Sequence, residues 1–300
     1  MPSPPVIALA PRHVTDLATA VEDGGGRVGA LEGADGLVWT EPLQAELPPL
    51  PPRVRWVQLP SAGVERWLGN LADGPTYTSA AGAFALPVAE HALALMLAGA
   101  RSLAACARAR EWSDPPARSL EGTTVAIVGA GGVGRALIEM LEPLCVRVLA
   151  VTRRGRPVPG AEITVPAERL DEVLEDADFV VLAAPGTPGT RRIVDAGRLA
   201  RMRPDAWLVN VGRGSLVDTD ALVAALEEGR LGGAALDVTD PEPLPPGHSL
   251  WTRADVLITP HIATTPDAER RHYAERVREN VARLAAGESL LGVIDLDAGY

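Results

Sequence analysis

The chain has 300 residues, of which 47% are hydrophobic and 22% are charged, so its composition is that of a globular protein long enough for two domains. Its net charge of −11 argues against a surface that binds nucleic acid or anionic membranes, because such surfaces are basic. The N-terminus lacks a secretory signal, and no apolar run reaches the ~18 residues of a membrane span. We therefore expect a cytoplasmic protein that contacts neither nucleic acid nor membranes.

The two cysteines, Cys106 and Cys145, lie far apart in the sequence. No cluster of histidine, cysteine and acidic residues has the spacing of metal ligands. We expect reduced thiols and no bound metal.

The N-terminal part of the chain alternates short β-rich runs with polar and helical segments. Residues 14–22 are predicted to be helical up to the three glycines at 24–26, and the proline-rich stretch 48–52 is predicted to be a loop. This alternation indicates a small parallel sheet covered by helices. The predicted strands are 6–9, 27–30, 36–40, 54–59 and 76–79.

A segment rich in alanine and leucine follows. Residues 87–107 are predicted to form one long helix that opens at Pro87, and residues 111–120 are predicted to form a connecting loop. The next segment begins with a buried strand. We therefore expect the chain to cross from one domain to the next here.

A glycine-rich turn follows the apolar run 125–128, which has the composition of a buried parallel strand. Gly129, Gly131 and Gly134 have GxGxxG spacing, and a helical segment continues from Arg135. The first glycine permits a tight turn, the second a close approach to a pyrophosphate, and the third close packing of helix on strand. The alternative is a plain structural turn, but the strand–turn–helix context favours dinucleotide binding. The predicted phosphate-binding residues are Gly129, Gly131, Gly132, Val133 and Gly134.

The alternation of strands and helices then continues to residue 260 and indicates a doubly wound sheet with the cofactor at the carboxyl ends of its strands. The last helix, 266–286, carries Tyr273, Val277, Val281 and Leu284 on one stripe, and we expect it to return to the first domain. The predicted domains are 1–90 plus 267–300, and 91–266. The predicted strands are 146–151, 179–184, 206–211, 234–238 and 256–259, and the predicted helices are 167–175, 195–202 and 218–228.

The end of the second strand of the dinucleotide unit indicates which cofactor binds. Sites for NAD usually place an acidic residue there, about 20 residues past the first glycine, to bind the ribose 2′-OH. This chain has Thr152 at that place, followed by Arg153, Arg154 and Arg156. The alternative is a solvated basic turn, but guanidinium groups pair well with a phosphate, so we expect NADPH to be preferred over NADH.

Three polar residues each follow a predicted strand of the same sheet. Arg213 lies between two glycines, Glu242 lies between two prolines, and His261 follows Pro260. Any one of them could be structural. Together they indicate a site at the carboxyl edge of the sheet.

These motifs resemble the D-isomer-specific 2-hydroxyacid dehydrogenase family over nearly the whole chain. The resemblance implies a Rossmann cofactor domain inserted in a smaller flavodoxin-like α/β substrate domain. It further implies that a hydride is exchanged between nicotinamide and C2 of a 2-keto or 2-hydroxy acid. It also implies a homodimer, through the long helix and the loop around Trp112. The segments that carry it are 61–65, 88–91, 129–134, 184–187, 209–218, 234–243 and 260–263.

The resemblance also implies residue roles. Arg213 would bind the substrate carboxylate and carbonyl oxygen, His261 would be the acid/base, and Glu242 would hydrogen-bond His261 and keep it protonated. These roles suit the reaction, because hydride transfer builds negative charge on the carbonyl oxygen. Backbone N–H groups of Ala62, Gly63 and Val64 would bind the carboxylate. The implied cofactor contacts, besides the glycine loop, are Thr152, Arg153, Arg154, Ala184, Pro185, Thr190, Val211, Asp237 and His261.

The chain departs from the family at a few positions. Thr239 replaces a residue that is often aromatic, and Cys145 replaces one that is often glycine. Thr152-Arg153, in place of an acidic residue, resembles the NADPH-using glyoxylate and hydroxypyruvate reductase branch. His91 is assigned to packing or to a domain interface, and His13, His248 and His272 to the surface.

The leading hypothesis is therefore an NADPH-dependent reductase of a small 2-keto acid such as glyoxylate or hydroxypyruvate. Oxidation of phosphite or formate is an alternative, because these small anions are also handled by an arginine. A non-catalytic dinucleotide-sensing protein is a third possibility. Oxidation of phosphoglycerate is disfavoured, because the first domain has no basic cluster to bind a phosphate.

Overall fold

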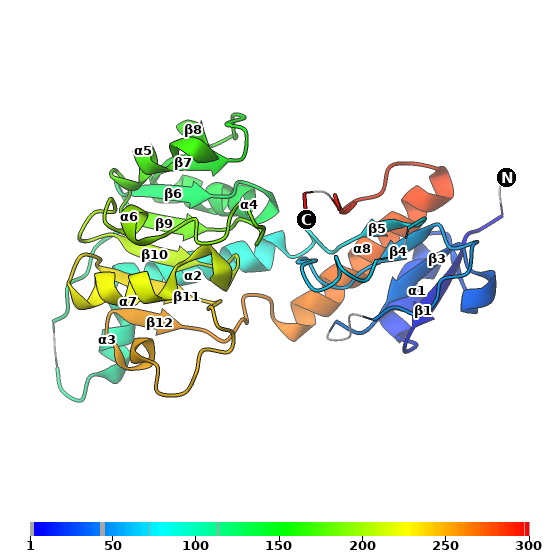
Figure 1. Ribbon diagram of the computed structural model, residues 1–300, viewed down its shortest axis with the longest axis horizontal. Helices are drawn as coiled ribbons and strands as arrows, with labels where there is room; N and C mark the ends of the chain where they lie inside the picture. The colour runs from blue at the N-terminus through cyan, green and yellow to red at the C-terminus, as the bar shows by residue number, and fades with distance from the viewer. Residues whose placement is uncertain (1–2, 43–45, 72, 113, 297, 300) are drawn as a thin grey trace. The chain divides into compact units, whose positions relative to one another are not determined.

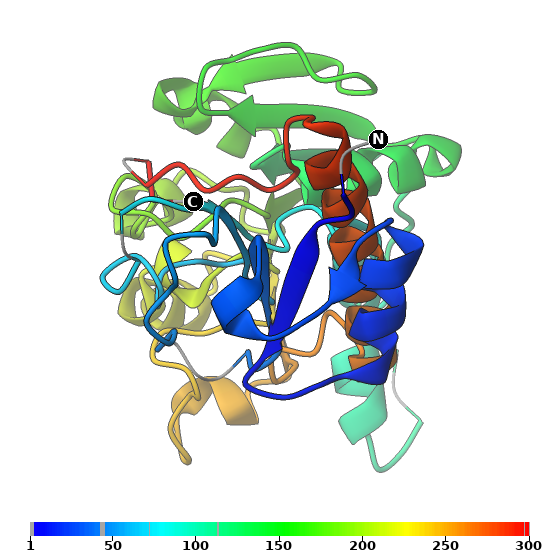
Figure 2. The same ribbon diagram turned by 90° about the vertical axis from the view of Figure 1, so that its right-hand side faces the viewer.

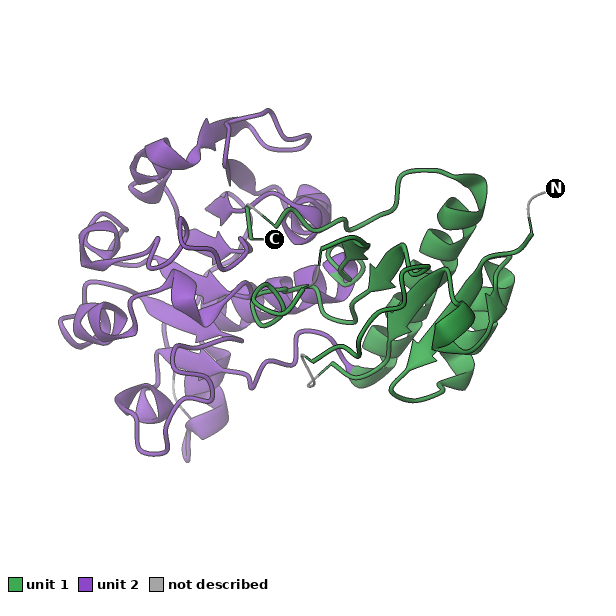
Figure 3. Cartoon of the chain, turned by 45° about the vertical axis from the view of Figure 1, so that its right-hand side comes forward, with its two compact units in different colours: residues 1–84, 266–300 green, residues 85–265 purple. Residues whose placement is uncertain are grey.

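The computed structural model describes residues 3–42, 46–71, 73–112, 114–296 and 298–299. The chain folds into two compact units, shown in different colours in Figure 3. Unit 1 comprises residues 1–84 and 266–300, and unit 2 comprises residues 85–265. The sequence placed these boundaries at 90 and 267. Residue 113, in the predicted loop 111–120, lies outside the described residues.

Unit 1 is built on a five-stranded parallel sheet with the order β2-β1-β3-β4-β5. This is the flavodoxin-like order. The sequence prediction of a small parallel α/β sheet is therefore confirmed. The strands are β1 (Val6–Ala10), β2 (Arg27–Val28), β3 (Gly36–Trp39), β4 (Trp56–Gln58) and β5 (Thr76–Thr78).

Two helices pack together on the sheet of unit 1. Helix α1 (Thr15–Asp23) and the C-terminal helix α8 (Pro266–Ala286) lie side by side (Figure 2). The buried Tyr273 hydroxyl of α8 donates hydrogen bonds to the carbonyls of Trp39 (2.8 Å) and Gln58 (3.3 Å). The predicted return of the last helix to the first domain is confirmed. Asn280, fully buried on the same helix, donates to Gln58 Oε1 at 2.8 Å.

Unit 2 contains a seven-stranded parallel sheet with the order β12-β11-β10-β9-β6-β7-β8, which can be followed in Figure 1. The order reverses between β6 and β9, so their carboxyl ends form the switch point at which ligands bind in doubly wound folds. The predicted doubly wound sheet is confirmed. The strands are β6 (Thr124–Val128), β7 (Arg147–Thr152), β8 (Ile163–Pro166), β9 (Phe179–Leu182), β10 (Trp207–Asn210), β11 (Gly233–Leu236) and β12 (Val256–Ile258).

Each face of this sheet has its own hydrophobic core. Along β6, Ala126 and Val128 belong to one core, and Val125 and Ile127 belong to the other, so the strand is apolar on both sides. No described helix has the length and apolar composition to cross a membrane. The helices are α2 (Ala85–Ala100) and α4 (Gly132–Leu141) in one core, α5 (Leu170–Leu174), α6 (Ala196–Leu199) and α7 (Thr219–Glu227) in the other, and α3 (Leu103–Arg108) after α2. Short 3-10 helices lie at Leu31–Gly33, Glu142–Leu144, Ala167–Arg169, Gly214–Leu216 and Ser249–Thr252.

The prediction of one long helix over 87–107 is wrong. Helix α2 ends at Ala100, and Ser102 adopts a left-handed conformation with φ of +48° before α3 begins. Residues 116–118 stabilise this break between the two helices. Ser102 Oγ donates to the carbonyl of Pro116, and Arg118 N donates to the carbonyl of Ala100 at 2.8 Å. A tertiary contact therefore ends a helix that the composition alone would continue.

Cys145 also has a left-handed backbone, with φ of +53°, directly after the 3-10 helix that ends at Leu144. A side chain is strained in this region by roughly 1–2 kcal/mol, whereas glycine is not. We expect Cys145→Gly to raise the free energy of unfolding by about 0.5–1 kcal/mol in urea denaturation. Cys145→Ala removes the thiol but keeps Cβ, so it should give no such gain. Equal stabilities of the glycine and alanine variants would contradict the prediction.

Candidate cofactor and active site

The three glycines between β6 and α4 have different surroundings. Gly129 has φ of +98°, and a Cβ there would lie 2.6 Å from the backbone nitrogen of Ala184, at the end of β9. A Cβ on Gly134 would collide with the carbonyl oxygen of Gly129, so close packing of α4 requires glycine there. A Cβ on Gly131 would meet no described atom within 4 Å. The turn is therefore tight at both ends and open in the middle.

The open middle of this turn is also the N-terminus of α4. The first intrahelical bond runs from Arg135 N to the carbonyl of Gly131 at 3.1 Å. The N–H groups of Gly132, Val133 and Gly134 precede it, so the helix itself does not satisfy them. Such groups at the positive end of a helix bind phosphate. This part of the site fits the pyrophosphate of a dinucleotide.

The end of β7 is the second place at which the residues present fit a dinucleotide. The hydroxyl oxygen of Thr152 is buried and has no hydrogen-bond partner among the described residues. Arg153, Arg154 and Arg156 are exposed on the turn that follows, in which Gly155 has φ of +65°. An orphaned hydroxyl beside exposed guanidinium groups fits a ribose that carries a polar or anionic 2′ substituent.

The loop after β9 contacts the glycine turn through Ala184 and is closed by its own hydrogen bonds. Thr190 Oγ1 donates to the carbonyl of Pro185 at 2.7 Å and accepts from Thr187 N at 2.8 Å. On the neighbouring strand, Val211 is buried, and its N–H donates to the carbonyl of Leu182 at 3.1 Å. The residues predicted for the cofactor from β6, β9 and β10 thus lie on one edge of the sheet.

Arg213 is positioned by the buried Asn210 at the end of β10. Asn210 Oδ1 accepts from Gly212 N at 3.1 Å, and Asn210 Nδ2 donates to the carbonyl of Arg213 at 2.8 Å. The guanidinium of Arg213 donates from Nη1 to the carbonyl of Gly212 at 2.7 Å. A Cβ on Gly214 would collide with the carbonyl of Thr239, so the loops after β10 and β11 are in contact.

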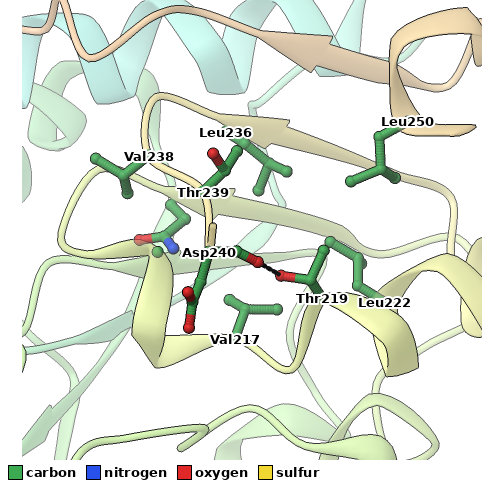
Figure 4. Close-up of a pocket in the computed structure, with 10 residues that line it drawn as sticks. Val217, Thr219, Leu222, Leu236, Val238, Thr239, Asp240 and Leu250 are labelled. Carbon is green, nitrogen blue, oxygen red and sulfur yellow. Dashed lines mark hydrogen bonds between the residues drawn. The ribbon is translucent and has the colours of Figure 1, made fainter. Parts of the chain in front are cut away.

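A small cavity under these two loops is lined by Val217, Leu222, Leu236 and Leu250 among others (Figure 4). Thr219 Oγ1 donates to the carbonyl of Asp240 at 2.6 Å across its rim, as the dashed line shows. This bond ties the loop of Glu242 to the start of α7. Contacts of Gly214 and Thr219 therefore fix the loop that carries Glu242 against the segment that follows β10.

His261 and Glu242 are hydrogen-bonded, with His261 Nδ1 2.7 Å from Glu242 Oε1. Their side chains are 53% and 43% exposed, so the pair opens toward solvent. The backbone of His261 is left-handed, with φ of +53°, and its N–H donates to the carbonyl of Asp237 at 2.8 Å. Because Nδ1 faces Glu242, Nε2 is the ring nitrogen that this pair leaves without a bond.

Asp237 is the most enclosed carboxylate of the site, with a side chain only 1% exposed. Its Oδ1 accepts from Thr259 Oγ1 (2.6 Å) and Ile262 N (3.0 Å), and its Oδ2 accepts from Ala263 N (3.1 Å). Burial raises the pKa of Asp237, but hydrogen bonds from His91, Thr259, Ile262 and Ala263 outweigh burial and leave the pKa below its ordinary value. The carboxylate is therefore held ionised.

Two members of this cluster, His91 and Thr259, were not among the site residues predicted from the sequence. His91 was assigned to packing or an interface, and Thr259 received no role. His91 Nε2 lies 3.0 Å from Thr259 Oγ1 and 3.3 Å from Asp237 Oδ1. The helical spacing of His91 could have placed it on the core side of α2. Nothing in the sequence shows which strand ends that helix covers.

In unit 1, the predicted carboxylate-binding loop follows β4 and is fixed by Ser61. Ser61 Oγ donates to the carbonyl of Gly63 at 2.7 Å, and the carbonyl of Ser61 accepts from Ala80 N at 2.9 Å. The N–H groups of Ala62, Gly63 and Val64 donate to no other group in the described part of the chain. Three successive N–H groups of this kind fit a carboxylate.

Comparisons with known proteins agree with this arrangement. The sequence model described as "D-isomer specific 2-hydroxyacid dehydrogenase, NAD binding domain" matches residues 93–263. An uncharacterized protein in the proB 3′ region of Corynebacterium melassecola is 41% identical, over 96% of this chain and 98% of that protein. A glyoxylate reductase of Pyrococcus furiosus is 36% identical over 67% of this chain and 63% of the reductase. The chain thus aligns with less than two thirds of that reductase.

Solved structures match the chain almost end to end. A D-isomer specific 2-hydroxyacid dehydrogenase from Xanthobacter autotrophicus, in complex with NADPH, has a TM-score of 0.85 at 28% identity and covers 99% of this chain and 100% of that one. An NADPH-dependent glyoxylate/hydroxypyruvate reductase from Sinorhizobium meliloti, in complex with NADP and sulfate, has a TM-score of 0.82 at 28% identity with the same coverage. The chain therefore belongs to the family of D-isomer specific 2-hydroxyacid dehydrogenases, which are NAD(P)-dependent oxidoreductases acting on CH–OH groups.

Proposed function

We propose that the protein is an NADPH-dependent reductase of small 2-keto acids, of the glyoxylate/hydroxypyruvate type. The observation that carries the proposal is the hydrogen-bonded pair His261–Glu242, at the sheet edge that also carries Arg213. The pair combines a proton donor with a carboxylate partner, and Arg213 adds a fixed cation. Reduction of a keto acid needs all three, because charge develops on the carbonyl oxygen as the hydride arrives.

The proposed roles of these groups are those that the family resemblance implies, and the bond between His261 and Glu242 supports them. A bound nicotinamide would supply the hydride that C2 of the keto acid receives. His261 donates the proton from Nε2 to the carbonyl oxygen, while Nδ1 keeps its proton in the bond to Glu242. Arg213 binds the substrate carboxylate and the carbonyl oxygen through its planar guanidinium. In unit 1, the backbone N–H groups of Ala62, Gly63 and Val64 have the chemistry to bind a carboxylate.

NADPH is proposed as the preferred cofactor because of the end of β7. Thr152 replaces the acidic residue that would accept a ribose 2′-OH, and three exposed arginines follow within four positions. The buried, unpartnered hydroxyl of Thr152 and the guanidinium groups would share the 2′-phosphate. The similar solved structures that hold NADPH or NADP give this assignment further support.

The proposal is tested by turnover in both directions. Glyoxylate and hydroxypyruvate are supplied with NADPH, and phosphite and formate are supplied with NADP and NAD. Reduction of the keto acids without oxidation of phosphite or formate supports the proposed function. Oxidation of phosphite or formate instead would assign the site to those anions, and binding of dinucleotide without turnover of any substrate would indicate a sensor.

We also propose that the protein is a homodimer that pairs through the region from the C-terminal half of α2 to Trp112. Leu97, Leu103 and Trp112 are exposed there, and Trp112 is exposed completely. Exposed leucine and tryptophan side chains in one segment are typical of an interface.

Negative charges introduced between α2 and Trp112 should therefore dissociate the dimer. We expect the double variant Leu103→Asp/Trp112→Asp to sediment as a monomer at micromolar concentration, where the wild type sediments as a dimer, because two carboxylates would be buried unpaired. Val293→Asp/Leu296→Asp places the same two charges on exposed apolar residues of unit 1 and serves as the control. A wild type that is monomeric, or a double variant that stays dimeric, would refute the assignment.

A further inference from the structure

His91 lies on the side of α2 that faces the sheet, three residues after Val88 and four before Leu95, which both pack in the core. Ala89 and Ala92 beside it are fully buried and small, so the helix can approach the strands closely. This brings the imidazole to the ends of β11 and β12. Its side chain is 20% exposed, so the ring is largely enclosed.

The hydrogen bonds around His91 determine where its proton lies. Thr259 has one hydroxyl proton, and it donates that proton to Asp237 Oδ1 at 2.6 Å. The hydroxyl oxygen, 3.0 Å from His91 Nε2, must therefore act as the acceptor toward the ring. Asp237 Oδ1, 3.3 Å from the same nitrogen, is also an acceptor. Both partners thus require a proton on Nε2, and the three side chains form one chain of donors from His91 to Asp237.

Asp237 connects this chain to the loop of the catalytic histidine. Its carboxylate accepts from the N–H groups of Ile262 and Ala263, and its backbone carbonyl accepts from the N–H of His261. Three successive residues are thereby held by one aspartate. These bonds hold His261 in its left-handed backbone conformation. A residue other than glycine adopts this conformation when the surrounding structure imposes it.

We propose that His91 is a positioning residue for His261, acting with Thr259 through the carboxylate of Asp237. The inference rests on the proposed function, in which His261 donates the proton. His91 does not touch the substrate or the reacting atoms. It orients the Asp237 carboxylate, and that carboxylate fixes the backbone from which the His261 side chain reaches Glu242 and the substrate.

The loss of this support should affect the rate more than the affinity for the cofactor. His91→Leu keeps most of the buried volume but removes one N–H donor, so the Asp237 carboxylate is held only by Thr259 and the two backbone N–H groups and is less firmly oriented. Displacement of a catalytic group by about 1 Å costs up to about 100-fold in rate, so a smaller shift is expected to cost about 10-fold or more. We expect kcat for glyoxylate reduction to fall by that factor, whereas the Kd for NADPH should rise by no more than about threefold, because the phosphate contacts are untouched and only the implied contact of Asp237 is affected.

Two further variants separate positioning from packing. His91→Gln carries an amide N–H near the place of Nε2 and should recover most of kcat. His272→Leu is a matched control, because His272 is also a helical histidine, 19% exposed and near a carboxylate, but belongs to α8 of unit 1. It should retain wild-type kcat. Equal loss of kcat in His91→Gln and His91→Leu, with both variants folded, would overturn the proposal.

Coupling between His91 and Thr259 provides a second test. Thr259→Val removes the hydroxyl that links the ring to Asp237, so its loss of kcat should resemble that of His91→Leu. The kcat of the double variant should be little lower than that of either single variant, because both substitutions interrupt the same hydrogen-bond network. Losses that multiply would show that the two side chains act independently, against the proposal.

Amide hydrogen exchange tests the same network without turnover. The N–H groups of Ile262 and Ala263, bound to the Asp237 carboxylate, should exchange about tenfold faster in His91→Leu than in the wild type or in His91→Gln. Unchanged exchange would refute the positioning role. If no keto acid is reduced, the proposed function fails, and faster exchange in His91→Leu would still establish the link from His91 to the 261–263 backbone.

Discussion

Replacing His261 with alanine should lower kcat for glyoxylate reduction by about 10³- to 10⁴-fold, because the reaction loses the group that protonates the developing alkoxide. The Kd for NADPH should change by less than about threefold, since Gly129, Gly131 and the arginines after β7 are untouched. Steady-state kinetics and fluorescence titration of NADPH measure the two quantities separately.

A histidine outside the site provides the control for this variant. His248 only caps a short 3-10 helix, where its Nδ1 accepts from Leu250 N at 3.3 Å. His248→Ala should therefore retain kcat. Loss of NADPH binding in His261→Ala, with kcat preserved at saturating cofactor, would show that His261 belongs to the cofactor site and not to the chemistry.

Replacing Arg153 and Arg154 together with serine should raise the Kd for NADPH by about 10- to 100-fold and leave the Kd for NADH nearly unchanged. The two cofactors differ by the 2′-phosphate, and a charge-assisted hydrogen bond to such a group contributes roughly 1.5–3 kcal/mol. Titration of both cofactors against the same variant isolates that contribution.

The net charge of the protein changes in this variant, so the control must remove the same charge elsewhere. Arg270 and Arg271 form an adjacent pair on α8 of unit 1, where Arg270 is paired with Asp267 at 2.6 Å. Arg270→Ser/Arg271→Ser should leave both Kd values unchanged. Equal weakening of NADPH and NADH by the Arg153/Arg154 variant would contradict the assignment of these arginines to the 2′-phosphate.

The sheet of each unit was predictable because parallel strands are buried on both faces and appear as short apolar runs. The stretch Val125–Val128, for example, supplies side chains to both cores of unit 2. Strand β8 was missed because only Val165 of its four residues is buried, so it resembles a surface loop. It forms at the sheet edge through its pairing with β7, which sequence periodicity does not reveal.

Some residues of the candidate site were predictable from the sequence and others were not, and the difference has a physical reason. Arg213, Glu242 and His261 lie in the loops that follow β10, β11 and β12, so the order of strands predicts that they share an edge. His91 reaches the same edge from a helix, and its role depends on how α2 crosses β10 and β11. That crossing is set by tertiary packing, such as Gly99 against the ring of Trp207. The break at Ser102 is likewise fixed by a contact from residues 116–118.

The reaction proposed for this sheet edge is the reduction of small 2-keto acids with NADPH. The most direct test is kcat/KM with glyoxylate, hydroxypyruvate, pyruvate and phenylpyruvate, each measured with NADPH and with NADH. We expect the highest values for glyoxylate and hydroxypyruvate, and at least about tenfold higher values with NADPH than with NADH. Activity confined to NADH, or confined to phenylpyruvate, would contradict it.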